Sequence, residues 1–245
     1  MIIMDLVRKG LAKSGYLLLK ESVMPKGFYL ETDIKRLFFL NKITKVVDIG
    51  AFHGDMTNFF LKTFPACHVL AVEPTPDSFK YTSNRFLNNP KVTVLNLGAG
   101  DKNDFLAFRI NADAQCNSFS TSFSNHSEPA IQVKVKKLDT IIEEDSEFNG
   151  AIDFLKLDVE GYELECLKGA EKLLKAEKIG LIYAEVGLIN DGHTSFTAIK
   201  DTLETYGFSF YSLYELYHYN KPTELAFANA LFINQAYIKA AGLML

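Results

Sequence analysis

Three acidic residues, Asp48, Glu73 and Asp158, lie at the ends of short apolar runs of the kind that form buried parallel strands. In an open sheet of parallel strands, ligands bind beyond the carboxyl ends of the strands, where the strand order reverses. Three carboxylates at this edge could accept hydrogen bonds from a ligand, balance a positive charge or take up a proton. We therefore predict that the functional site lies at this edge.

Two glycines, Gly50 and Gly54, frame the turn after the first run. Glycine lets the backbone approach a ligand closely or adopt a positive φ angle. The spacing Gly-x-x-x-Gly differs from the Gly-x-Gly-x-x-Gly that holds a pyrophosphate, which disfavours a dinucleotide. Glu73 follows about 20 residues downstream, where an acid can accept both hydroxyl hydrogens of a ribose. A solvated strand end before Pro74 is the alternative interpretation.

The elements that must position these residues alternate between strand and helix. The apolar patterns predict strands over residues 46–49, 68–72, 92–97, 152–157 and 181–186, and helices over 55–64, 77–87, 162–174 and 195–206. Two final strands, 208–216 and 225–234, are close enough in sequence to pair antiparallel. The predicted fold class is α/β: a doubly wound sheet of seven core strands, mostly parallel with an antiparallel last strand. Residues 105–110 and 131–136 predict an inserted hairpin around a polar loop at 111–128.

The composition, 48% hydrophobic and 23% charged, favours a globular domain, which we place at residues 41–245 after a helical extension at 1–40. A net charge of -4 offers no overall field for nucleic acid. The three cysteines, Cys67, Cys116 and Cys166, lack the spacing of metal ligands and are odd in number, which favours a reducing cytoplasm. Because no apolar run reaches the ~18 residues that span a bilayer, we expect no transmembrane segment.

The N-terminal segment has the spacing of an amphipathic helix. Its apolar positions are Met4, Val7 and Leu11, and Arg8, Lys9 and Lys13 lie between or beside them. In one interpretation the helix packs on the domain or covers the functional site. In the other it makes a weak contact with a membrane surface.

Three segments resemble those of FkbM-family methyltransferases. They read VVDIGAFHG at 46–54, LDTII at 138–142 and FLKLDVEGYE at 154–163, the last followed by LKGA at 167–170. The first is common to all class I methyltransferases, whereas the last is more specific to this family. The resemblance spans about residues 43–234. Two positions depart from the family pattern: Phe52 stands where many members have a small polar residue, and Ala228-Asn229-Ala230 replaces an acid-containing sequence, which affects the predicted acceptor pocket.

The resemblance implies a seven-stranded class I sheet, S-adenosylmethionine as cofactor and an oxygen nucleophile, often a sugar hydroxyl of a polysaccharide, glycolipid or natural product. Glu73 would then bind the ribose, Asp48 would lie near the methionine portion directly or through water, and the turn at 98–101 would border the adenine. The predicted cofactor-binding residues are Asp48, Gly50, Ala51, Phe52, His53, Gly54, Glu73, Pro74, Ala99, Gly100 and Asp158.

Asp158, Glu160 and His193 are the predicted catalytic residues. A hydroxyl is a poor nucleophile at neutral pH, so a nearby base or metal would help. Asp158 is the leading candidate for the base. Helix capping is an equally good interpretation of Glu160. A plain surface position is an equally good interpretation of His193. Glu185 could join Asp158 in binding Mg²⁺, which prefers a few carboxylates and several waters.

The acceptor is expected to be a small molecule or a glycan, and the sequence is compatible with a homo-oligomer. Tyr211, Tyr214, Tyr217 and Tyr219 suggest stacking against a sugar, with core packing as the alternative. Two other functions stay open: methylation of a non-sugar hydroxyl, and a catalytically silent cofactor-binding module.

Overall fold

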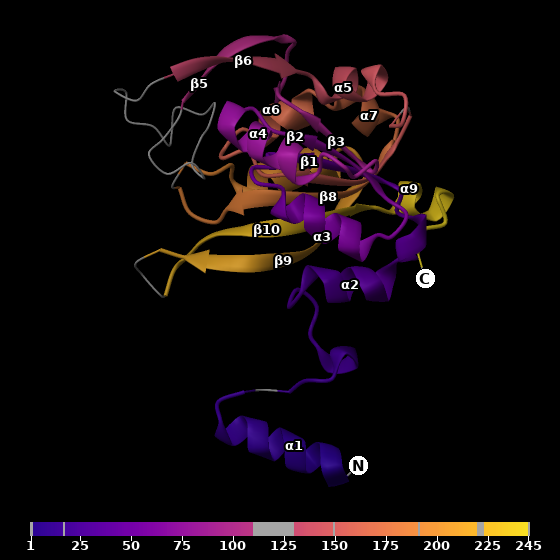
Figure 1. Cartoon of the computed structure of the whole chain (residues 1–245), viewed down its shortest axis with the longest axis vertical. Coiled ribbons are helices and arrows are strands. Elements are labelled where there is room, and N and C mark those ends of the chain that lie inside the picture. The colour runs from indigo at the N-terminus through magenta and orange to yellow at the C-terminus, as the bar shows by residue number, and fades with distance from the viewer. Residues whose placement is uncertain are drawn as a thin grey trace.

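A seven-stranded sheet forms the centre of the computed structural model, which describes residues 2–16, 18–109, 130–148, 150–190, 192–219 and 223–244. Its strand order is β3-β2-β1-β7-β8-β10-β9 (Figure 1). The strands are β1 (Lys45–Ile49), β2 (His68–Val72), β3 (Val92–Leu95), β7 (Ile152–Leu157), β8 (Ile179–Gly187), β9 (Phe208–His218) and β10 (Leu225–Asn234).

The directions of the strands confirm the predicted α/β sheet. β1 pairs in parallel with β2 on one side and with β7 on the other, and the parallel arrangement continues to β3 and to β8. β10 is antiparallel both to β8 and to β9. The strand order therefore reverses between β1 and β7, and a ligand is expected at the carboxyl ends of these two strands.

Helices cover both faces of the sheet. They are α2 (Leu30–Leu37), α3 (Asp55–Thr63), α4 (Pro76–Arg85), α5 (Leu138–Glu144), α6 (Glu163–Lys168), α7 (Glu171–Lys175), α8 (Phe196–Glu204) and α9 (Gln235–Ala240). A further helix, α1 (Ile2–Lys13), precedes them, and short 3₁₀ turns lie at Glu21–Val23 and Leu40–Lys42. Successive strand residues point to opposite faces. Val47 accordingly packs in the core cluster under α5 to α8, whereas Val46 packs in the cluster under α2, α3 and α9.

A small second sheet lies beside the main one, in the order β4-β6-β5. The predicted hairpin is confirmed, because β5 (Asp104–Arg109) and β6 (Ala130–Lys136) pair antiparallel. The polar loop predicted at 111–128 lies outside the described residues. β3 ends earlier than predicted because the chain leaves the main sheet, and β4 (Gly98–Ala99) pairs in parallel with β6.

The prediction of one continuous helix over 162–174 was wrong, since α6 and α7 are separated at Gly169 and Ala170. A Cβ atom at Gly169 would lie 1.9 Å from the carbonyl oxygen of Gly100. The helix therefore breaks where its backbone contacts the backbone that follows β4. This contact holds α6 against the turn that was predicted to border the adenine.

The segment before residue 41 contains two helices. α1 lies apart from the sheet in Figure 1, whereas α2 packs Leu30 and Ile34 into the core cluster of the main domain. The division of the chain at residue 40 stays a prediction. Within the described residues, no helix combines the length and apolar character needed to cross a bilayer.

Candidate functional site

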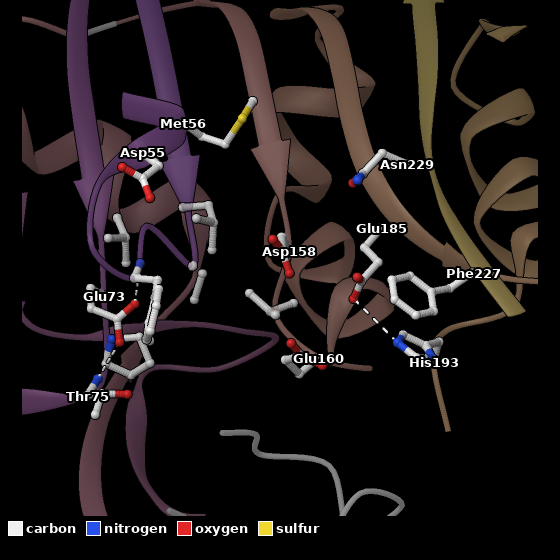
Figure 2. Close-up of a pocket in the computed structure, with 18 of the residues that line it drawn as sticks. Asp55, Met56, Glu73, Thr75, Asp158, Glu160, Glu185, His193, Phe227 and Asn229 are labelled. Atoms are coloured by element: carbon white, nitrogen blue, oxygen red, sulfur yellow. Dashed lines mark hydrogen bonds and ion pairs between the residues drawn. The ribbon is translucent and has the colours of Figure 1, made fainter. Parts of the chain in front are cut away.

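A cavity of about 630 Å³ opens at the carboxyl edge of the main sheet. Figure 2 shows Glu73 and Thr75 at one end, Glu185, His193 and Phe227 at the other, and Asp158 between them. β1, β2 and β7 supply the first residues beyond their own ends, β8 supplies Glu185 from near its end, and β4, β9 and β10 supply walls. The cavity therefore lies where the strand order predicts a ligand.

The turn after β1 depends on its two glycines. Gly50 and Gly54 both have a φ angle of 77°, a left-handed conformation that L side chains rarely adopt. A Cβ atom on Gly50 would also lie 1.8 Å from the carbonyl oxygen of Asp158, and one on Gly54 would lie 2.6 Å from the Phe86 ring. The glycine spacing therefore lets the turn pack closely against the end of β7 and against α4.

Glu73 holds the first end of the cavity. Its carboxylate is 4% exposed and accepts hydrogen bonds from the backbone N–H groups of Phe52 and Thr75, both at 2.8 Å. Burial raises the pKa of this carboxyl, and the hydrogen bonds from Thr75 and Phe52 partly offset the rise. The Thr75 side chain donates to Glu73 as well. Since a carboxylate has about four acceptor positions, Glu73 can still accept a ribose hydroxyl.

Lys156, a residue that the sequence predictions missed, joins two of the predicted acids. Its ammonium group lies 3.4 Å from Asp48 Oδ1 and 3.2 Å from Asp158 Oδ2, and it donates to the Gly50 carbonyl at 2.7 Å. Burial by itself would lower the pKa of Lys156, but the carboxylates of Asp158 and Asp48 outweigh it and raise the pKa. A lysine within the apolar run 152–157 was the available signal, because buried lysines require partners.

Asp48 lies behind the cavity wall. It is completely buried, accepts a 2.6 Å hydrogen bond from the Thr57 hydroxyl, and is absent from the described residues that line the cavity. Asp48 is therefore linked to the cavity through Lys156, which also contacts Asp158 and the Gly50 carbonyl.

The remaining predicted cofactor residues divide into two groups. Gly50, Phe52, Glu73, Pro74, Ala99 and Asp158 line the cavity, whereas Ala51, His53, Gly54 and Gly100 are absent from its described lining. The His53 ring stacks between Phe52, at 3.8 Å, and Tyr81, at 4.4 Å. This stack indicates that His53 supports the turn from outside.

The turn after β7 carries Glu160 in an unusual conformation. Its φ angle is 53°, and Gly161 follows at 87°. Such a conformation persists in a non-glycine residue only when its surroundings hold it. Glu163 does so, because its buried carboxylate accepts hydrogen bonds from the N–H groups of Val159, at 3.1 Å, and Gly161, at 3.3 Å, and from the Thr194 hydroxyl. Glu163 thus holds together the turn that precedes α6, whereas Glu160 lines the cavity.

The second end of the cavity brings Glu185 and His193 together. The His193 Nε2 lies 3.8 Å from Glu185 Oε2, and the imidazole stacks on Phe227 with ring centres 4.5 Å apart. Burial raises the pKa of Glu185 well above its ordinary value, and repulsion from Asp158 and Glu160 adds to the rise. The donor atoms of Glu160, Glu185 and His193 all lie within 4.8 Å of one another. Glu185 therefore groups with these two residues, and not with Asp158 as predicted.

An aromatic wall extends this end. Phe227 stacks on Tyr217 with ring centres 4.6 Å apart and lies 5.9 Å from Tyr219. Tyr214, in contrast, packs in the core and donates a hydrogen bond to Asp33. Of the four tyrosines singled out in the sequence, Tyr217 and Tyr219 line the cavity, and Tyr211 and Tyr214 pack in or against a core cluster.

Asn229 also reaches the cavity, where its side-chain amide donates a 2.8 Å hydrogen bond to Glu215 Oε2. This residue occupies the position at which the sequence departs from the family pattern. The departure therefore lies on the wall formed by β9 and β10. Glu215 was another lining residue that the sequence predictions missed.

Comparison with known proteins agrees with this architecture. The family model of the methyltransferase FkbM domain matches residues 48–210. "Methyltransferase 1" of Beauveria bassiana (strain ARSEF 2860) is 28% identical over 183 residues, covering 67% of this chain and 72% of that protein.

Two solved structures are similar to the chain. The crystal structure of the methyltransferase FkbM from Methylobacillus flagellatus KT has a TM-score of 0.50 and 20% identity; the match covers 77% of this chain and 44% of that one. M. capricolum TrmK, solved with S-adenosyl-homocysteine, has a TM-score of 0.47 and 10% identity, covering 84% of this chain and 68% of that one. With the family model spanning β1 to β9, the chain belongs to the FkbM methyltransferase family and is an S-adenosylmethionine-dependent methyltransferase.

Proposed function

We propose that this enzyme is an O-methyltransferase that methylates a hydroxyl group of a sugar in a glycan, glycolipid or natural product. The observation that carries the proposal is the division of the cavity into two ends (Figure 2). One end offers a buried carboxylate suited to a ribose, and the other combines carboxylates with stacked aromatic rings. Asp158 lies between them, where donor and acceptor would meet.

The first end fits the nucleoside of S-adenosylmethionine. Glu73 has an acceptor position left for a ribose hydroxyl, and the absence of a Cβ on Gly50 permits the tight turn beside it. Gly98 and Ala99 form the neighbouring wall, where we place the adenine. Asp158 would then face the positively charged sulfonium, with Asp48 contributing indirectly through Lys156.

The second end fits a carbohydrate. Flat aromatic rings pack against the C–H faces of sugars, and the Tyr217 ring, which stacks on Phe227, lines the cavity. Glu215 and Asn229 supply an acceptor and a donor for sugar hydroxyls on the same wall. This combination of polar groups and aromatic rings supports a sugar over a purely apolar acceptor.

The reaction needs alignment and a destination for one proton. Bound S-adenosylmethionine supplies an electrophilic methyl group: the acceptor oxygen forms a bond to that carbon, the carbon–sulfur bond breaks with its electron pair staying on sulfur, and the hydroxyl proton leaves. We assign the proton to Asp158. Lys156 contacts its Oδ2, which leaves Oδ1 for the acceptor, while Glu160 and His193 position the hydroxyl. Alignment can contribute on the order of 7–11 kcal/mol, and a positioned base ~10²–10⁴-fold in rate.

The proposal is tested with a methyl-transfer assay on nucleotide sugars and extracted glycans, in which mass spectrometry locates the added methyl group. Asp158→Asn is expected to lower kcat by about 10²–10⁴-fold while leaving S-adenosylhomocysteine binding within about threefold, since the change keeps the shape of the side chain. Methylation confined to non-sugar hydroxyls would refute the sugar assignment. Cofactor binding without turnover on any acceptor would favour a silent module.

The two described cysteines, Cys67 and Cys166, are free and buried. Free thiols persist in reducing compartments. This observation supports our proposal that the enzyme acts in the cytoplasm, on acceptors made there.

A further inference from the structure

We propose that Glu160, Glu185 and His193 bind one divalent transition-metal ion, such as Mn²⁺ or Zn²⁺, at the acceptor end of the cavity. The role that we give the ion, activation of the acceptor hydroxyl, rests on the proposed function. The binding site itself rests on the geometry and charge of these three side chains.

The spacing of the donor atoms suits one ion. Bonds from nitrogen and oxygen ligands to such metals measure about 2.0–2.2 Å, so two ligands of one ion lie at most about 4.4 Å apart. The three donor atoms of the cluster already lie within 4.8 Å of one another. Three ligands of one ion cannot all lie opposite one another, so small torsional adjustments that move the donor atoms by about 1 Å would complete the coordination.

Glu185 provides the independent sign of a ligand. It is 9% exposed, and its Oε2 atom has no hydrogen-bond partner among the described residues. The His193 Nε2 faces this oxygen at 3.8 Å, which is too long for a hydrogen bond but fits two ligands on either side of an ion. Buried carboxylate oxygens are normally paired or bind a metal. Figure 2 shows both side chains directed toward each other at the cavity wall.

The charge around the cluster also favours a cation. Asp158, Glu160 and Glu185 line the cavity together. Lys156, the described ammonium group that contacts Asp158, is already held by Asp48 and the Gly50 carbonyl. A divalent ion would offset the remaining negative charge at the second end.

The residues that bear the ligands are held in place by their neighbours. Glu163 binds the turn that carries Glu160 and also the hydroxyl of Thr194, the residue after His193. Gly187 lets the His193 loop fold back on β8, because a Cβ atom there would lie 2.9 Å from the His193 Cβ. Such fixed support is what orients ligands in metal sites.

The donor set selects the kind of metal. Mg²⁺ and Ca²⁺ prefer oxygen ligands, whereas imidazole suits first-row transition metals. Three protein ligands also leave coordination positions open for a substrate oxygen. A hydroxyl bound there would lose its proton more readily, and Asp158, which lines the same cavity, would receive that proton.

The test uses full-length protein treated with a chelator, titrated in a calorimeter with MnCl₂, ZnCl₂ and MgCl₂. We expect one Mn²⁺ or Zn²⁺ per chain and at least tenfold weaker binding of Mg²⁺. Glu185→Gln and His193→Ala should each weaken Mn²⁺ binding by at least tenfold. Glu215→Gln is the matched control, since it removes a carboxylate from the same cavity but outside the cluster; it should leave Mn²⁺ affinity within about threefold. Titration with S-adenosylhomocysteine verifies that each variant keeps a folded cofactor site.

The inference is overturned if no saturable binding occurs, if Mg²⁺ binds as well as Mn²⁺, or if Glu215→Gln weakens binding as much as Glu185→Gln. Failure here is distinguishable from failure of the proposed function. Sugar methylation that persists in metal-free protein refutes the role given to the ion and leaves the proposed function standing. Metal binding without methylation of any sugar upholds the site and refutes the acceptor.

Discussion

Replacing Lys156 with methionine tests whether this lysine is the partner that allows Asp48 to be buried as a carboxylate. The substitution keeps the length of the side chain but removes its charge. Asp48 is fully buried, and the Lys156 ammonium group at 3.4 Å is the described cation beside its Oδ1, an oxygen with no hydrogen bond among the described residues. Removing one partner of a buried ion pair costs about 3–5 kcal/mol. Asp158 adds little to this figure, because its side chain is 38% exposed and water screens it.

We therefore expect Lys156→Met to lower the free energy of unfolding by about 3–5 kcal/mol, measured by urea denaturation followed by circular dichroism. The double variant Asp48→Asn/Lys156→Met should recover much of the loss, because no unpaired charge is left in the core. Lys172→Met is the control: its ion pair with Glu143 is shorter, at 2.9 Å, but both side chains are exposed. The unfolding transition of Lys172→Met should have its midpoint at the same urea concentration as that of the unmodified protein.

Two results would refute this reasoning. If Lys156→Met shifts the transition no more than Lys172→Met does, Asp48 is not held as a carboxylate by Lys156. If the double variant is as unstable as the single one, the cost comes from packing rather than from charge. Measuring the free energy of unfolding at alkaline pH tests the same ion pair. Because the pKa of Lys156 is raised in the folded protein, its stabilisation is fully present below the pKa of an unfolded lysine, about 10.4, and is lost as the pH rises through the raised value.

Two further predictions concern the two ends of the cavity. Glu73→Gln should weaken S-adenosylhomocysteine binding by at least about tenfold, since a charge-assisted hydrogen bond contributes about 1.5–3 kcal/mol. Because burial raises the pKa of Glu73, the affinity of the unmodified enzyme should fall as the pH drops through that raised value, and calorimetry should find the Glu73→Gln variant insensitive to the same change. A flat wild-type profile would contradict the ribose assignment. Tyr217→Ala should raise the KM for a sugar acceptor by about 2- to 12-fold, the equivalent of 0.5–1.5 kcal/mol for an aromatic contact. The affinity for the cofactor should stay unchanged. If only the cofactor affinity changes, the Tyr217 ring contacts the cofactor and not the acceptor.

Local patterns were sufficient to predict the seven strands of the main sheet. The apolar runs at residues 46–49, 68–72 and 152–157 match β1, β2 and β7 to within one residue. The local pattern failed where a tertiary contact ends a helix. The predicted helix over 162–174 breaks at Gly169 because the Gly100 carbonyl lies against it. Helix propensity depends on neighbouring residues, so it could not predict a contact between Gly169 and Gly100, which are far apart in the sequence.

The sequence by itself determined the residue types at the strand ends and the glycine turn, because strand periodicity and backbone sterics act over a few residues. It placed Asp48, Glu73 and Asp158 at one edge of the sheet. Only the tertiary structure decided which side chains meet there. Strand register sets Lys156 opposite Asp48, and the folding of a loop onto β8 sets His193 beside Glu185. These partners are far apart in the chain, so pairing register and packing, which no local pattern encodes, determined the chemistry of the site.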